Sequence, residues 1–269
     1  MSEITVNGVT LFYEEDGFGP ETIVFSHSYL LDSTHFSPQI EALSDRYRCI
    51  AFDHRGHGRS QAPKDGYDME NLYNDAVALI EALNCAPCHF VGLSTGGFIG
   101  MRIAIRRPEM LNSLILMDTT GEAESEKNIR QFKRLLFVVR WLGWRPVINK
   151  VMPFFFAEKF LTDPGRQDEV RYWKEVIIYG NKKALKKFGI GIFSRTSVFE
   201  ELSRITVPTL VIVGEKDMAR SVYEAQRTAE KIHGAKLVSI PDAAHLCTIE
   251  EPAMVNAAIE EFLSPPLVA

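Results

Sequence analysis

Several features are scarce or missing in this sequence, and each absence excludes a class of protein. No stretch of about 18 apolar residues occurs, so the sequence predicts no transmembrane helix and no stable membrane insertion. The N-terminal residues Met1-Ser2-Glu3-Ile4 lack the basic and apolar leader of a secretory signal. Only 4 of the 269 residues are cysteine, too few for a scaffold built on disulfides. We therefore expect a cytoplasmic protein.

Motifs and charges that bind nucleotides, nucleic acids or metals are missing as well. The Gly-x-x-x-x-Gly-Lys-Ser/Thr loop does not occur, and the glycines after the first expected strands do not fit the dinucleotide pattern. The formal net charge is -5, whereas a general nucleic-acid binder carries a basic surface. The 7 histidines do not form the dense cluster with aspartates that a metal-dependent lactonase needs. The sequence thus predicts no cofactor, no catalytic metal and no nucleic-acid partner.

Short apolar strands alternate with helical segments, in a chain whose 46% apolar and 24% charged residues are ordinary for one folded domain. The expected strands are residues 4–6, 9–13, 22–26, 49–53, 89–93, 111–117, 209–214 and 236–240. The expected helices are residues 36–43, 69–83, 97–107, 222–232 and 252–263. This alternation predicts an α/β fold with a mostly parallel sheet covered by helices on both faces.

The alternation breaks between residues 121 and 197, which hold all three tryptophans and eight of the 17 phenylalanines in helical patterns. Three prolines divide this segment into several helices. We expect residues 1–120 and 198–269 to form the core, and residues 121–197 to form a helical lid that partly lines a pocket. Residues 121–200 also carry 16 basic against 9 acidic residues, which is typical of a solvated face; a patch that steers anionic substrates is the alternative.

The most informative stretch is His89-Phe90-Val91-Gly92-Leu93-Ser94-Thr95-Gly96-Gly97, which joins an apolar strand, a Gly-x-Ser-x-Gly turn and the start of a helix. A serine between two glycines can sit on a turn so sharp that larger neighbours would clash, with its hydroxyl lifted clear of the sheet. This context predicts a nucleophile elbow at Ser94.

A serine nucleophile needs a base, and the base needs a group that orients it. His245 follows the last expected strand, and Asp217 follows the strand before it. The chain order Ser94, Asp217, His245 is the order associated with elbow-bearing hydrolases. Asp118 also ends a strand and is the rival acid, although the position of Asp217 favours Asp217 as the orienting acid and a structural role for Asp118.

These motifs together resemble the α/β-hydrolase family along essentially the whole chain, and within it the small carboxylesterases and lactonases, such as the 3-oxoadipate enol-lactonase group and related acyl-homoserine lactonases. The motifs that carry the resemblance are Asp53-His54-Arg55-Gly56-His57-Gly58-Arg59-Ser60, Gly92-Leu93-Ser94-Thr95-Gly96-Gly97, Gly214-Glu215-Lys216-Asp217 and Ala244-His245. The resemblance implies an oxyanion hole formed by the backbone N–H groups of Tyr29 and Thr95. The chain departs from the family at Ser28, where a glycine is usual.

The expected activity is metal-free hydrolysis of carboxylic esters or lactones by Ser94, His245 and Asp217. The aromatic lid favours a substrate with an apolar acyl or aryl portion, N-acyl-homoserine lactones being candidates, and the protein is expected to be a monomer or homodimer. Serine at the elbow argues against dehalogenase and epoxide-hydrolase chemistry, which needs a carboxylate nucleophile. Carbon–carbon bond hydrolysis and perhydrolysis use the same triad and stay open, as does a ligand-binding or signalling protein on a hydrolase scaffold.

Overall fold

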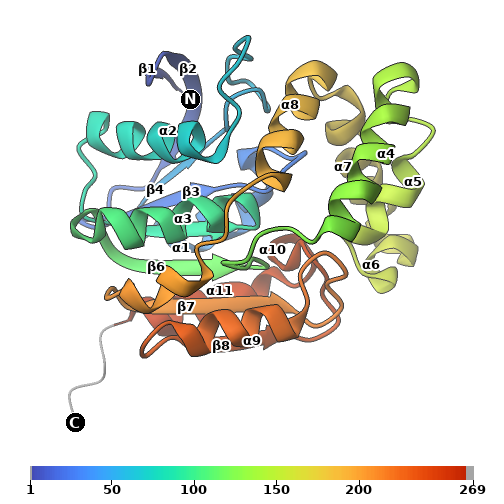
Figure 1. Ribbon diagram of the computed structural model, residues 1–269. Helices are drawn as coiled ribbons and strands as arrows, with labels where there is room; N and C mark the ends of the chain where they lie inside the picture. Colours follow the sequence, from blue (N-terminus) through green and yellow to red (C-terminus); the bar gives the residue numbers. More distant parts are fainter. Residues whose placement is uncertain (1, 265–269) are drawn as a thin grey trace.

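The computed structural model describes residues 2–264, which form a central sheet with helices on both faces (Figure 1). The strand order is β1-β2-β4-β3-β5-β6-β7-β8. Strand β2 is antiparallel to both of its neighbours, and every other neighbouring pair is parallel. The strands are β1 (Ser2–Val6), β2 (Val9–Asp16), β3 (Thr22–Ser26), β4 (Arg48–Phe52), β5 (Cys88–Leu93), β6 (Leu111–Met117), β7 (Thr209–Gly214) and β8 (Lys236–Ile240). The expected α/β class, with a mostly parallel sheet covered by helices on both faces, is confirmed.

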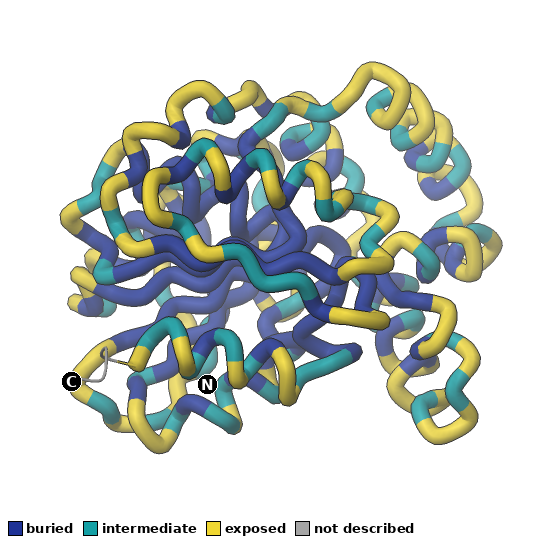
Figure 2. The backbone as a smooth tube through the Cα atoms, turned by 90° about the horizontal axis from the view of Figure 1, so that it is seen from below, coloured by how far each residue is buried: buried dark blue, intermediate teal, exposed yellow. Residues whose placement is uncertain are grey.

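The burial of the strands explains why their sequences are so apolar. Every residue of β3, β5 and β7 is buried, as is usual for parallel strands covered on both faces. Figure 2 shows this buried sheet between two layers of helices. At the antiparallel edge, Asn7 and Gly8 both have positive φ, 46° and 71°, which is the turn geometry that joins β1 and β2 in a tight hairpin.

The helices of the core form two layers. On one face α1 (Ser37–Leu43) packs against α11 (Pro252–Leu263), and on the other α2 (Met69–Ala82) packs against α3 (Thr95–Arg106). Helix α9 (Val222–Lys231) lies against β7 and β8, and the short α10 (Cys247–Glu250) precedes α11.

The segment of residues 121–197, which we call the insert, contributes the helices grouped beyond the carboxyl ends of the strands (Figure 1). They are α4 (Glu126–Leu142), α5 (Ile148–Val151), α6 (Glu158–Thr162), α7 (Gln167–Tyr179) and α8 (Lys182–Phe193). Short 3-10 turns fill the gaps at Met152–Phe154 and Pro164–Arg166, each with a proline in its first turn. No helix within residues 2–264 is long and apolar enough to cross a membrane.

Candidate active site

Ser94 occupies the sharp turn between β5 and α3. Its backbone has φ 53° and ψ -104°, a region that costs a non-glycine residue about 1–3 kcal/mol. The surrounding chain holds it there, because Ser94 N donates to Met117 O at 2.8 Å and Thr119 Oγ1 donates to Ser94 O at 2.9 Å. A side chain at Gly96 would collide with the Ser26 carbonyl, so only glycine allows this approach of helix to strand.

His245 and Asp217 meet at the ends of β8 and β7. The imidazole Nδ1 is 2.8 Å from Asp217 Oδ2, and both side chains are almost fully buried. Asp217 Oδ1 accepts two further hydrogen bonds, from Ala219 N at 2.6 Å and Arg220 N at 2.9 Å. An acid held in this way fixes the ring so that Nε2 is left to act as a base. Among the described residues, Ser94 Oγ makes no hydrogen bond to His245, although both line one pocket.

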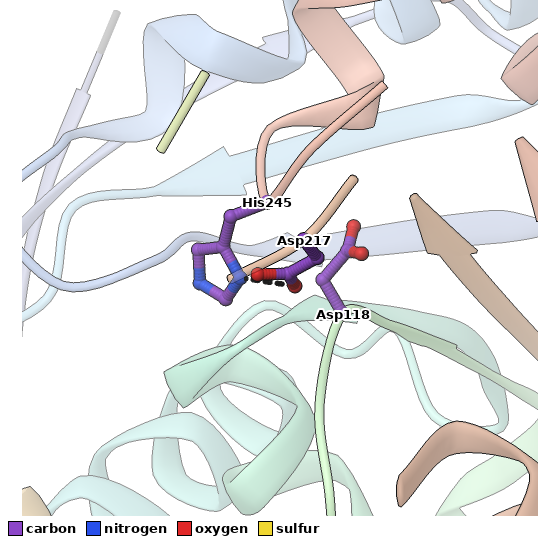
Figure 3. A group of neighbouring side chains, drawn as sticks. All are labelled: Asp118, Asp217 and His245. Atoms are coloured by element: carbon purple, nitrogen blue, oxygen red, sulfur yellow. Dashed lines mark hydrogen bonds and ion pairs between the residues drawn. The ribbon is translucent and has the colours of Figure 1, made fainter. Parts of the chain in front are cut away.

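Asp118 extends this arrangement into a row, with Asp217 next to His245 and Asp118 beside Asp217 (Figure 3). Asp118 Oδ1 accepts from Gly214 N at 2.8 Å, and Oδ2 accepts from Cys247 Sγ at 3.0 Å. Burial and the neighbouring charge of Asp217 raise the pKa of Asp118 well above its ordinary value. Asp118 thus lies behind Asp217 and has no hydrogen bond to His245 among the described residues.

The same three side chains bring one ligand atom each within 4.8 Å of one another, a spacing that a metal ion could use. Their polar atoms already have partners: backbone N–H groups and the Cys247 thiol for the carboxyls, and Asp217 for the imidazole Nδ1. The geometry therefore favours a hydrogen-bonded row over a cation site.

The loop of residues 27–31 is positioned by neutral histidines. His57 Nε2 accepts from Leu30 N at 3.3 Å, and His27 donates from Nδ1 to Ser28 O at 2.7 Å while its Nε2 accepts from His54 N. Burial lowers the pKa of His27 and His54 well below the ordinary value and that of His57 to about 3, so these rings stay uncharged. A loop held by uncharged rings keeps its shape over the physiological pH range.

The backbone N–H groups of Tyr29 and Thr95 have no hydrogen-bond acceptor among the described residues. Thr95 is the first residue of α3, and the first N–H groups of a helix have no partner within it. The Tyr29 side chain is fixed by the insert, because its hydroxyl donates to Leu185 O at 2.8 Å and its ring stacks on Phe188. Ser28, the departure from the family pattern, is buried and lines the pocket.

The pocket is a cavity of about 470 Å³ between the sheet and the insert. Ser94, His245 and Tyr29 line its inner end. The insert supplies an apolar wall made of Phe132, Leu135, Val151, Phe154, Phe155 and Phe193. Several of the insert aromatics therefore contact the cavity, while Trp144 and Trp173 are buried in the packing of the insert itself.

A cluster of charged side chains in the wall of this pocket was not expected from the sequence. Glu124 precedes α4, Arg195 follows α8, and Arg220 lies between β7 and α9. Burial acts to raise the pKa of Glu124, but Arg220 and Arg195 outweigh it and hold the pKa at about 2. The three residues are too far apart in the chain for any spacing rule to link them.

The insert is also joined to the loop that carries His245. Leu246 N donates to Phe155 O at 3.0 Å. Glu250 accepts from Ala157 N through Oε2 and from Ala244 N through Oε1, both at 2.7 Å. These bonds, which we call the insert–loop junction, place the backbone of the candidate base against the insert.

Comparison with known proteins identifies the fold family. A family model described as the alpha/beta hydrolase fold matches residues 21–252, most of the chain. The chain belongs to the α/β-hydrolase family. Among curated relatives, this hydrolase is 28% identical to 3-oxoadipate enol-lactonase 2 of Acinetobacter baylyi over 264 residues, which cover 97% of this chain and 95% of the relative. A putative carbamate hydrolase of Agrobacterium fabrum is 27% identical and covers 91% of this chain and 93% of its own length.

Solved structures give the same result. The enol-lactonase of Burkholderia xenovorans superimposes on this hydrolase with a TM-score of 0.90 at 29% identity, covering 98% of this chain and all of that one. A thermophilic esterase of Thermogutta terrifontis has a TM-score of 0.91 at 27% identity and covers 98% of both chains. This hydrolase therefore shares its fold with an enol-lactonase and an esterase along nearly its full length.

Proposed function

We propose that this enzyme hydrolyses carboxylic esters or lactones through an acyl intermediate on Ser94. The observation that carries the proposal is the 2.8 Å contact between His245 Nδ1 and the buried Asp217 carboxylate, in a pocket that also exposes the elbow serine. An ester or lactone carbonyl is the electrophile that such a serine attacks. The likeness to an enol-lactonase and an esterase supports the same reaction class.

In the first half-reaction, Ser94 Oγ attacks the carbonyl carbon while His245 Nε2 takes the hydroxyl proton. Asp217 stabilises the resulting imidazolium through Nδ1. The N–H groups of Tyr29 and Thr95 bind the oxyanion of the tetrahedral intermediate, and each such donor is worth about 10²–10³ in rate. The carbon–oxygen bond then breaks, and His245 returns the proton to the departing alkoxide.

In the second half-reaction, water attacks the acyl-enzyme carbonyl and His245 takes a proton from that water. The bond between Ser94 Oγ and the acyl carbon breaks, and the proton passes to Ser94 Oγ. An open ester releases its alcohol before this step. A lactone instead keeps the alcohol tethered to the acyl group, so one hydroxy acid leaves at the end.

The insert acts in this proposal as a lid over the acyl chain. Its apolar side chains form the outer wall of the pocket, and Leu185 and Phe188 hold Tyr29 from the same side. Covering the site excludes water from the oxyanion and strengthens its hydrogen bonds.

The substitution Ser94→Ala tests the nucleophile. We expect kcat on aryl esters and on acyl-homoserine lactones to fall by at least about 10³-fold, because the substitution removes the attacking hydroxyl. In parallel, a fluorophosphonate probe should add one adduct to the wild type, located on the peptide that contains Ser94. Ser203→Ala changes an exposed serine outside the pocket and serves as the matched control, with unchanged turnover and labelling.

Labelling of another residue, or substantial turnover by Ser94→Ala, would overturn the nucleophile assignment. A single burst of product without further turnover would instead favour a ligand-binding role on the same scaffold.

A further inference from the structure

The charged cluster in the pocket wall contains more hydrogen-bond donors than acceptors. Glu124 Oε2 accepts from Arg220 Nη2 at 2.6 Å and from Arg195 Nη1 at 3.4 Å. Glu124 Oε1 accepts from Asn128 Nδ2 at 2.8 Å and from Ser125 N at 3.2 Å. Each oxygen of the Glu124 carboxylate therefore already accepts two hydrogen bonds.

Three nitrogens of the cluster have no acceptor among the described residues: Nε and Nη2 of Arg195 and Nε of Arg220. All three are shut off from solvent, and a buried donor without a partner costs about 1–3 kcal/mol. The Nε and Nη2 groups lie on one edge of a guanidinium, and that edge matches the two oxygens of a carboxylate.

The cluster also carries an excess of positive charge. The side chains of Arg195 and Glu124 are 2% and 3% exposed, that of Arg220 11%. Burial, and then the charge of Arg220, lowers the pKa of Arg195 to about 9, so it remains a cation at neutral pH. A second carboxylate, Glu224, lies 4.0 Å from Arg220 but is 26% exposed and caps α9 through Ser221. One buried anion thus faces two cations.

The excess charge lies close to the reacting atoms. The Arg195 guanidinium stacks 4.0 Å from the centre of the Phe98 ring, and Phe98 N donates to Ser94 O at 3.1 Å. One helical turn, about 5.4 Å along the axis of α3, therefore separates Ser94 from Phe98, the residue on whose ring the Arg195 guanidinium lies. Arg220 is also next to the candidate triad, because its backbone N–H donates to Asp217 Oδ1.

We propose that Arg195 and Arg220 form a carboxylate-binding subsite, and that the substrate is an ester or lactone carrying a carboxylate a few bonds from the scissile carbonyl. This inference rests on the proposed hydrolase function. The side chains around the two guanidinium groups move apart to admit the carboxylate. The sequence predicts a substrate with an apolar acyl or aryl portion, and the subsite adds an anionic end to that portion.

Matched substrate pairs test the subsite. Monoethyl esters of dicarboxylic acids from succinate to suberate are each compared with the ester whose far end is the neutral carboxamide, by pH-stat. We expect the wild type to prefer the acid over the amide by about tenfold or more in kcat/KM at the best chain length, which is the range of a charge-assisted hydrogen bond.

The substitution Arg195→Met leaves Glu124 its nearer partner, Arg220, and should bring the acid-to-amide ratio close to one. Arg195→Lys should restore part of the ratio. Arg204→Met changes an exposed arginine outside the pocket and should leave the ratio unchanged. A ratio near one in the wild type, or one that Arg195→Met does not alter, would overturn the subsite and leave the hydrolase proposal standing.

Binding provides a test that needs no turnover. Calorimetry with adipate and with its neutral diamide on Ser94→Ala should show binding of the acid alone, weakened about tenfold or more by Arg195→Met. If the wild type hydrolyses none of the esters but adipate binds and depends on Arg195, the hydrolase proposal fails while the anion site survives. If adipate does not bind, the subsite itself is wrong.

Discussion

At the scale of single residues, the two candidate acids have different surroundings. Asp217 accepts one hydrogen bond from His245 and two from backbone N–H groups. Asp118 accepts from Gly214 N and from the Cys247 thiol, and burial, followed by the charge of Asp217, raises its pKa well above the ordinary value. Asp217 is thus the acid in contact with His245.

We predict opposite outcomes for the two isosteric amides. Asp217→Asn should lower kcat by about 10⁴-fold, because the amide would donate to His245 and select the wrong tautomer. Asp118→Asn should cost less than about tenfold, since the amide oxygen can still accept the hydrogen bond from Gly214 N and Asp118 does not contact His245. Steady-state kinetics on one aryl ester compares them. A larger loss in Asp118→Asn than in Asp217→Asn would make Asp118 the orienting acid.

Sequence patterns could indicate Ser94, Asp217 and His245 because each follows a strand whose position the apolar runs reveal. The pairing of Glu124 with Arg195 and Arg220 could not be predicted, because those residues come from three loops. Their approach depends on how the insert folds over the sheet, and no local pattern encodes it. The presence of Arg195 and Arg220 in the pocket wall could therefore not be predicted from the sequence.

At the scale of elements, Glu250 is the side chain that joins the insert to the loop carrying His245, because its two oxygens accept from Ala157 N and Ala244 N. Burial raises the pKa of Glu250 from an ordinary value of 4.5 to about 7. The hydrogen bonds from Ala157 N and Ala244 N lower the pKa, but by less than burial raises it. A carboxyl whose pKa is raised by folding contributes stability that is fully present below its unfolded pKa and is lost as pH rises through the folded pKa.

We therefore predict that the wild type loses up to about 3 kcal/mol relative to Glu250→Gln between about pH 4.5 and pH 7.5. The amide cannot accept from both Ala157 N and Ala244 N, so the variant should be less stable than the wild type at low pH. Urea unfolding at several pH values measures both effects, with the exposed Glu261→Gln as the control. A difference between wild type and Glu250→Gln that does not change with pH would exclude the linkage.

The limits of some strands and helices can be predicted from the local sequence pattern, whereas the limits of others depend on packing against neighbouring elements. Strands β3, β6, β7 and β8 have the predicted limits, because each is a compact apolar run between turns. Helix α3 begins at Thr95 instead of the expected residue 97, since Gly96 and Gly97 are helical against Ser26 and Thr119. The helix expected over 36–43 begins one residue later, at Ser37, because Phe36 ends a 3-10 turn of Ser33–Phe36 that is capped by Asp32.

At the scale of the whole molecule, the hydrophobic core runs without a break from the sheet into the insert. Polar contacts cross the same boundary, including Tyr29 to Leu185 and Arg102 to Thr196. The division into a core and a lid stays a prediction, and the two parts share one hydrophobic core. A cytoplasmic location and a monomeric or dimeric state also remain predictions.

One cooperative unfolding transition follows from this continuity. All three tryptophans lie in the insert, so their fluorescence reports on the insert, while far-ultraviolet circular dichroism reports on all helices and strands. We predict that the two signals give the same urea midpoint and slope, as two-state unfolding requires. An earlier fluorescence transition would show that the insert unfolds alone.

The hydrogen bonds of residues 155–157 to the loop at 244–250 bear on how relatives of this enzyme could exchange parts. An insert transplanted from another family member would bring a different backbone to the peptide that supports His245. If the transplanted segment begins after Ala157 and ends at residue 197, residues 155–157 and the loop at 244–250 still come from the same parent. A transplanted segment that begins before Phe155 takes these two partners from different parents. The first exchange should therefore preserve activity and the second lose it, even when both chimaeras fold.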